Sequence, residues 1–148
     1  MPIAGEELAA GKRILRLVKD IPRFIPPGYS LPTGDAFEPS TDDKEEARKR
    51  AQPVRVSVWD LELTTVEQAK AFRASEQLLA FDLMVQDVID VRQLFNCHRL
   101  RVVADPFDVS QPGAYGHCGI EGLDRQKGED RKTYRATLDE LAKRAKPI

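Results

Sequence analysis

The chain has 148 residues, 41% of them hydrophobic and 32% charged, and its formal net charge is −1. These values predict one domain over residues 1–148, and they exclude a bulk charge attraction to nucleic acid or to an anionic membrane surface. No apolar run approaches the roughly 20 residues that cross a bilayer. Two cysteines are too few for a disulfide scaffold, so we expect a cytoplasmic protein in a reducing compartment.

Residues 6–19 are predicted to form an amphipathic helix. Their large apolar residues, among them Leu15 and Val18, recur near the 3.6-residue period of one helix face. Gly5 can serve as the N-cap, and the two glutamates that follow it suit the first turn. Gly11 weakens the expectation for the first half, because glycine costs about 1 kcal/mol relative to alanine inside a helix.

Six of the ten prolines lie within residues 21–53, which disfavours regular helix or sheet there. Large apolar side chains are interspersed with these prolines, and a disordered linker rarely carries so many. We therefore expect an ordered, proline-rich segment that wraps over the core in extended form. The charged tract at 42–50 is expected to be an exposed loop or a short helix. The apolar residues of this wrap are Phe24, Ile25, Tyr29, Leu31 and Phe37.

Residues 54–59 alternate between apolar and polar side chains, which is typical of a half-buried strand. We expect the three valines of this strand to face the core, with the other three residues on the opposite side. A helix follows, capped by Thr64 or Thr65 and ending near Arg73.

The second half of the chain adds further helices and one strand. Residues 75–90 are expected to begin as a helix, while the β-branched residues from Val88 onward favour a strand equally. Residues 100–104 predict a short strand that ends at an Asp-Pro step, and residues 129–146 predict a C-terminal amphipathic helix. The fold class is therefore α+β: a small mixed sheet packed by the N-terminal helix, a central helical region and the C-terminal helix.

Glycine recurs at every third position between residues 113 and 122, around a histidine. Glycine is needed where φ is positive or where something approaches the main chain closely. One interpretation is a ligand-binding loop in which Gly113, Gly116 and Gly119 contact an anion and His117, the candidate catalytic residue, transfers protons. The alternative is a tight crossover that packing alone requires. Neither the dinucleotide fingerprint nor the phosphate-binding loop sequence is matched.

Basic residues outside this loop are the candidates to hold a phosphate group. Arg23, Arg55 and Arg101 are the arginines considered for that role in a nucleotide-like ligand. Net charge is 0 over residues 1–50, −4 over 51–123 and +3 over 124–148. The basic C-terminal helix is therefore expected either to touch phosphate or an acidic partner, or to present a solvated face with paired charges.

Each of the two histidines adjoins a cysteine, at Cys97-His98 and at His117-Cys118. Four such ligands suit tetrahedral zinc, but adjacent residues on a strand point to opposite faces, and the usual spacing within each ligand pair is absent. We therefore expect no metal site and no cofactor. A nucleophilic pair of Cys118 with His98 is the alternative use of these residues.

Short motifs follow one another in a set order between residues 21 and 123. They are Ile21-Pro22-Arg23, Ala36-Phe37-Glu38-Pro39, Val56-Ser57-Val58, Thr65-Val66-Glu67-Gln68-Ala69, Asp105-Pro106, and His117 with Ile120-Glu121-Gly122. This order resembles small bacterial proteins of mobile, anti-phage and conflict loci. The resemblance implies a bacterial, cytoplasmic protein that depends on a partner, and it brings no settled activity. Cys118 departs from the small residue expected after the histidine.

Two hypotheses about function follow. The first is an accessory or binding subunit that acts with a larger protein partner, in an anti-phage or conflict system, because no complete catalytic motif occurs and the proline-rich wrap suits docking. The second is a small nucleotide-directed enzyme or toxin that uses the His117 loop. Nucleic-acid binding by the C-terminal helix is a further alternative that net charge does not indicate. No membrane association is expected.

Overall fold

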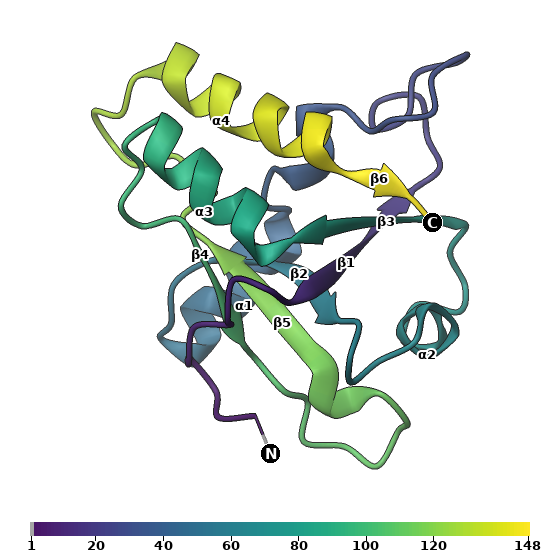
Figure 1. The fold of residues 1–148 in the computed structure, drawn as a ribbon. Coiled ribbons are helices and arrows are strands. Elements are labelled where there is room, and N and C mark those ends of the chain that lie inside the picture. Colours follow the sequence, from purple (N-terminus) through teal and green to yellow (C-terminus); the bar gives the residue numbers. More distant parts are fainter. Residues whose placement is uncertain (1) are drawn as a thin grey trace.

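Residues 2–148 are described by the computed structural model, and they form an α+β fold, as the sequence predicts. Within this range four α-helices pack against a six-stranded sheet with the strand order β4-β5-β2-β1-β3-β6 (Figure 1). Each pairing of these strands is antiparallel, so the expectation of a mixed sheet is wrong. The strands are β1 (Arg13–Lys19), β2 (Arg55–Asp60), β3 (Leu78–Met84), β4 (Arg101–Ala104), β5 (His117–Glu121) and β6 (Lys146–Pro147).

The helices lie on both faces of this sheet. Two of them, α3 and α4, run side by side over one face, while α1 lies behind the sheet (Figure 1). The main core lies beneath α3 and α4, and a second apolar cluster on the other face includes Trp59 and Ala69 of α2. The helices are α1 (Thr41–Arg50), α2 (Val66–Ala71), α3 (Val85–Leu94) and α4 (Arg131–Arg144), with short 3₁₀ helices η1 (Gly34–Phe37) and η2 (Ala114–Gly116).

The predicted N-terminal helix over residues 6–19 is wrong, because its second half is the strand β1. Ile14 and Val18 face the main core, whereas Leu15 and Leu17 face the second cluster. A strand buried on both faces is apolar at nearly every position, and such a run imitates the apolar spacing of a helix. Pairing with β2 and β3 on its two sides places β1 inside the sheet.

The expectation for residues 75–90 is reversed: the first half is the strand β3, and a helix follows it. All seven residues of β3 pair with β1, from Arg13 opposite Met84 to Lys19 opposite Leu78. The Asp87 side chain accepts a hydrogen bond from the Met84 amide at 3.0 Å, which caps α3. The valines that favoured a strand lie fully buried inside this helix, because packing against the core overrides the weak β preference of such residues.

The proline-rich segment at 21–53 is partly helical rather than extended throughout. Phe37 is fully buried in the core, and Phe24 packs against that core, as a wrap requires. Tyr29, however, is 70% exposed. The charged tract forms α1, whose first turn is closed by reciprocal hydrogen bonds between Ser40 and Asp43.

Four other predicted elements are confirmed. The strand β2 has Val56 and Val58 in the core, whereas the third valine, Val54, precedes the strand, is half-buried and lies outside the core, contrary to prediction. The strand β4 ends before the Asp-Pro step. The helix α2 has Thr65 as its N-cap, with a reciprocal bond to Gln68. The C-terminal helix α4 starts at an Asp130 cap and buries the apolar face that its periodicity predicts.

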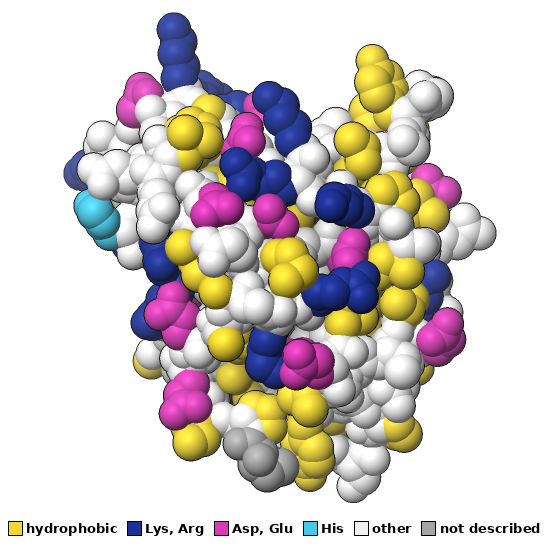
Figure 2. Space-filling view, in the orientation of Figure 1, with side chains coloured by type: hydrophobic (Ala, Val, Ile, Leu, Met, Phe, Trp, Pro, Cys, Tyr) yellow, Lys and Arg dark blue, Asp and Glu magenta, His cyan; other side chains and the backbone are white. Residues whose placement is uncertain are grey.

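The surface over α3 and α4 mixes acidic and basic side chains, as Figure 2 shows. Arg144 of α4, for example, lies 3.7 Å from Asp87 and 3.6 Å from Asp90, both on α3. Hydrophobic side chains gather at the lower end of the same view (Figure 2). No helix within residues 2–148 is long and apolar enough to span a bilayer.

Candidate functional site

His117 is the first residue of β5 and lies in the interior, with 6% of its surface exposed. Its two ring nitrogens have different partners. Nδ1 lies 2.8 Å from the main-chain oxygen of Asp105, at the end of β4, and 3.7 Å from the Asp105 carboxylate. Nε2 lies 2.6 Å from Oγ of Ser57, in the middle of β2. The pairing of β2, β5 and β4 therefore brings together Ser57 of β2, His117 of β5 and Asp105, the residue that follows β4.

The partners of His117 fix which nitrogen carries the proton. A main-chain carbonyl only accepts hydrogen bonds, so Nδ1–H donates to Asp105. Burial lowers the pKa of His117, with the Asp105 carbonyl and carboxylate opposing that shift, so the ring is neutral near pH 7. Nε2 is then unprotonated and accepts the Ser57 hydroxyl. A serine hydroxyl that donates to a neutral imidazole, itself held at its other nitrogen, is the arrangement of an activated nucleophile.

Aromatic side chains hold the His117 ring in place. The Phe107 ring stacks on it at a centroid distance of 3.9 Å and an interplanar angle of 15°. The Trp59 ring meets it edge to face at 4.8 Å. Because Phe107 covers one face of the ring and Nδ1 is hydrogen-bonded, the Nε2 edge is held toward Ser57.

The main chain at Ser57 is also held. Arg16 donates to the Ser57 carbonyl oxygen at 3.0 Å and to the carbonyl oxygen of Ala36. Burial lowers the pKa of Arg16 to about 10, which leaves it charged near pH 7. The β1–β2 pairing ends near Ser57, at Leu15 opposite Trp59. The Arg16 guanidinium therefore supplies a hydrogen bond to the Ser57 carbonyl in place of a strand partner.

Ser57 and His117 line a cavity of about 420 Å³ between the sheet and α1. One carboxylate oxygen in it, Oδ1 of Asp105, is buried and makes no hydrogen bond within residues 2–148. Its nearest cations are Arg55 at 3.3 Å and Arg50 at 3.5 Å. A buried polar atom without a hydrogen bond is rare and marks a place where a ligand group or water can bind. The other lining residues are Asp42, Asp43, Glu46, Gln52 and Phe107.

A line of charged side chains crosses the sheet beside this cavity. Glu121 of β5 lies between Arg55 of β2 and Arg101 of β4, its two cross-strand neighbours. The Nε atoms of these arginines donate to the two oxygens of the Glu121 carboxylate, at 2.9 and 2.7 Å. This carboxylate is buried and shared by two cations, so it fixes the Arg55 stem next to Ser57.

The glycines of the predicted ligand loop each have a packing neighbour. A Cβ at Gly119 would lie 2.6 Å from Cβ of Arg55, and one at Gly116 would lie 1.8 Å from Oγ1 of Thr64. Gly113 has a φ of +85° and is close to Thr64 and Gln68. The loop is therefore tightly packed against α2 and β2, which is the crossover interpretation; contact of these glycines with an anion stays a prediction.

The predicted phosphate-binding arginines are not gathered at His117. Arg55 lines the cavity, whereas Arg101 is held by Glu121 and does not line it. Arg23 lies on the proline-rich segment, where it pairs with Asp35 at 3.1 Å. The structure thus brings His117 together with one of the three arginines, and ligand binding by the other two stays a prediction.

The predicted nucleophilic pair of Cys118 with His98 lacks a reactive thiol, because Cys118 is buried. Cys118 is 2% exposed, and burial raises the pKa of its thiol to about 12, so it is protonated at neutral pH. Cys97 is a free, half-buried cysteine, and His98 is exposed. Residues 2–148 contain no group of three or more His, Cys, Asp or Glu side chains placed to hold a metal ion.

Ser57 and Glu121 are not predicted from the sequence as members of the site. Ser57 was assigned only to the polar side of a strand, and β5 was not predicted, so nothing placed it opposite the His117 loop. The one indication in the sequence is that Ser57, a small hydroxyl residue, lies between Arg55 and Trp59 on the same side of the predicted strand. A charged residue two positions after Gly119 gave the same hint for Glu121.

Comparison with protein-family models, with curated proteins and with solved structures gave no match to this chain. The function must therefore be argued from the geometry of the Ser57–His117 cavity itself.

Proposed function

We propose that the chain is a small acyl-transfer hydrolase in which Ser57 is the nucleophile and His117 is the general base. The observation that carries this proposal is the 2.6 Å contact between Oγ of Ser57 and Nε2 of His117 at the wall of a cavity. The main-chain oxygen of Asp105 plays the orienting role at Nδ1. Fold supplies no argument here, so the proposal depends on the geometry alone.

The reaction proceeds in two halves. First, the Ser57 oxygen bonds to the carbonyl carbon of an ester while Nε2 of His117 accepts the hydroxyl proton. The leaving alcohol takes that proton from His117 as its bond to the acyl carbon breaks. Water then attacks the acyl-serine in the same way, which releases the acid and restores the hydroxyl. Arg50 and Arg55 line the cavity and are the cations that would stabilise the developing negative oxygen.

The charge of the cavity indicates the class of ester. Its α1 wall carries three carboxylates, from Asp42, Asp43 and Glu46, and one cation, Arg50, which pairs with Glu46 at 3.9 Å and with Asp105 at 3.5 Å. Arg55, the inner cation, is already paired with Glu121 and Asp105. A phosphate group would meet these carboxylates, whereas an ester with a cationic substituent would be attracted to them. We therefore favour a cationic ester over the nucleotide-like substrate of the sequence-based hypothesis.

The test compares hydrolysis of an acetate ester that bears a quaternary ammonium group with that of its neutral counterpart of the same size. We expect the cationic ester to react about tenfold faster. Ser57→Ala and His117→Gln should each lower the rate by about 100-fold or more. Equal rates in the wild type and in these two variants would overturn the proposal.

Matched variants separate chemistry from folding. Ser110 is an exposed serine outside the cavity, so Ser110→Ala should keep the full rate. Asp42→Asn should reduce the preference for the cationic ester, whereas Glu45→Gln, on the same helix but outside the cavity, should not. Thermal unfolding of each variant confirms that it is folded.

A second candidate function is an accessory subunit that docks onto a larger protein. It is favoured by a group of exposed hydrophobic side chains around a cavity of about 330 Å³ near the N-terminal segment. Ile3 is 61% exposed, Tyr115 49% and Leu63 46%. Contiguous apolar surface of this kind is typical of interaction sites.

The docking role is tested by co-expression with the products of neighbouring genes, followed by size-exclusion chromatography. We expect one of these gene products to co-elute with the wild-type chain. The same product should not co-elute with the Tyr115→Glu or the Leu63→Glu variant. Leu94→Glu, which changes another exposed leucine (61%) on α3, is the matched control. Elution of the chain by itself in every co-expression contradicts this role.

A further inference from the structure

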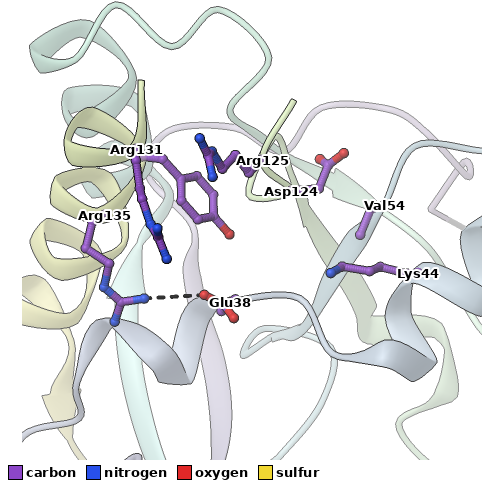
Figure 3. Close-up of a pocket in the computed structure, with 8 residues that line it drawn as sticks. Glu38, Lys44, Val54, Asp124, Arg125, Arg131 and Arg135 are labelled. Atoms are coloured by element: carbon purple, nitrogen blue, oxygen red, sulfur yellow. Dashed lines mark hydrogen bonds and ion pairs between the residues drawn. The ribbon is translucent and has the colours of Figure 1, made fainter. Parts of the chain in front are cut away.

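A second cavity, of about 550 Å³, lies between the start of α4, α1 and the segment that precedes α4 (Figure 3). In Figure 3, Arg131 extends from α4 and Lys44 from α1 into the space beside Glu38. Arg125 and Arg135 also line this cavity. Side chains from three separate parts of the chain therefore place four cations around one space.

The acidic residues of this cavity are already paired. Glu38 is held by Arg135 at 3.3 Å and by Arg23 at 3.7 Å. Asp124 is paired with Arg99 at 3.2 Å. Each carboxylate that lines the cavity thus has an arginine partner, and one of the four cations, Arg135, is used in this way.

The other three cations have no acidic partner. Within residues 2–148, no carboxylate oxygen lies within 4.0 Å of a side-chain nitrogen of Lys44, Arg125 or Arg131. Arg125 donates only to the main-chain oxygen of Glu129, at 3.3 Å. Three unpaired positive charges around one concave space create a local positive potential, although the whole chain has a net charge of −1.

We propose that this cavity binds a small ligand that carries a phosphate or diphosphate group, held by Lys44, Arg125 and Arg131. Arginine binds phosphate oxygens through paired N–H groups, and lysine adds a point charge. Tyr134 lines the same cavity, and its hydroxyl is a further donor because burial raises its pKa to about 12. The volume fits a ligand of mononucleotide size.

The same helix, α1, separates this cavity from the Ser57–His117 cavity. Lys44 lines the first, and Asp42 and Glu46 line the second. At about 100° per residue these side chains lie on opposite sides of the helix, with the buried Ala47 between them. The two cavities have different lining residues and opposite charge character. The anion-site proposal can therefore be tested independently of the proposed hydrolase.

The test is calorimetric titration of the full chain with inorganic pyrophosphate at low and at high salt. We expect binding that weakens with salt and that is at least about tenfold weaker in Arg131→Gln and in Lys44→Gln. Lys132→Gln and Lys49→Gln change exposed neighbours on the same two helices that do not line the cavity, and they should bind as the wild type does. All four positions are exposed, so these variants should fold.

Two results would overturn the proposal. One is the absence of pyrophosphate binding at low salt. The other is binding that Arg131→Gln and Lys44→Gln leave unchanged, which would place the anion elsewhere. A parallel titration with a single-stranded oligonucleotide addresses nucleic acid: tight oligonucleotide binding without pyrophosphate binding would reject the small ligand in favour of a nucleic-acid surface.

Discussion

The hydroxyl oxygen of Ser57 lies 2.6 Å from Nε2 of His117, although 60 positions of sequence separate the two residues. The contact is produced by the antiparallel pairing of β2 with β5, in which Ser57 lies opposite Gly119 and Trp59 opposite His117. The absence of a side chain at Gly119 leaves room for the Arg55 stem, which occupies the space beside this pair. The register of one strand pair therefore creates the site.

Gly119→Ala should destabilise the fold by about 1–3 kcal/mol, because its Cβ would lie 2.6 Å from Cβ of Arg55. Urea unfolding of the two proteins measures the difference. Gly11→Ala is the control: no atom lies within 4 Å of the added Cβ, so its stability should match or exceed that of the wild type. A Gly119→Ala protein as stable as the wild type would show that Arg55 moves aside freely.

Glu121→Ala should lower the free energy of unfolding by about 3 kcal/mol or more, because it removes the buried carboxylate that pairs with the largely buried Arg55 and with Arg101. Arg55 then keeps Asp105, at 3.3 Å, and the side-chain oxygen of Gln52, at 3.0 Å. Glu129→Ala is the matched comparison, since its pair with Arg99 lies at the surface and should contribute less than about 1 kcal/mol. Equal losses of unfolding free energy in the two variants would mean that the Arg55–Glu121 pair stabilises the fold no more than a surface ion pair does.

The stability that depends on His117 should decrease as the medium becomes acidic. Because the folded state holds the pKa of His117 below its ordinary value of 6.5, the unfolded chain takes up the proton first as pH falls. The stabilising contribution is complete above about pH 6.5 and is lost progressively below it. His117→Gln lacks this proton, so its free energy of unfolding should fall less than that of the wild type between about pH 7.5 and pH 5.

Denaturant titrations of both proteins at the two pH values check this expectation. The His98→Gln protein is the matched control, because it removes the exposed histidine in place of the buried one. The account of a buried neutral ring is wrong if His117→Gln and the wild type lose the same stability over this range.

The two cysteines should differ strongly in their reaction with iodoacetamide. Cys97 is half-buried, whereas Cys118 is buried and has a thiol pKa raised to about 12. Since the thiolate is the reactive form, Cys97 should be alkylated first, and Cys118 only after denaturation. Peptide mass spectrometry over a time course measures both rates. Alkylation of Cys118 in the folded protein at the rate of Cys97 would contradict its burial.

The parts of the fold with strong local signals could be predicted from the sequence. The alternation at Val56 and Val58 predicted β2, and the periodicity of residues 129–146 predicted α4. The strand β1 could not be distinguished from a helix, because burial of Ile14 and Leu15 on opposite faces removes the alternation that marks a strand. That distinction depends on neighbours that are distant in the sequence.

The sequence predicts two residues of the candidate site, Arg55 and His117. Their partners depend on strand pairing: Ser57 and Glu121 meet His117 and Arg55 through the register of β2 and β5, and no local pattern encodes that register. The glycines at 113, 116 and 119 have close packing neighbours in the turn before α2, in α2 and in β2, and ligand contact by these glycines stays a prediction. The regular spacing of the glycines does not show whether they are required for close packing or for contact with a ligand.

The central claim is that His117 activates Ser57. Covalent modification tests it most directly: the folded protein is treated with an organophosphonate fluoride, which reacts with activated serine hydroxyls, and the adduct is located by peptide mass spectrometry. The account predicts one adduct, on Ser57, that is absent in His117→Gln and accompanied by no modification of Ser110. An unmodified Ser57 at saturating reagent, or modification of Ser57 that persists in His117→Gln, would contradict it.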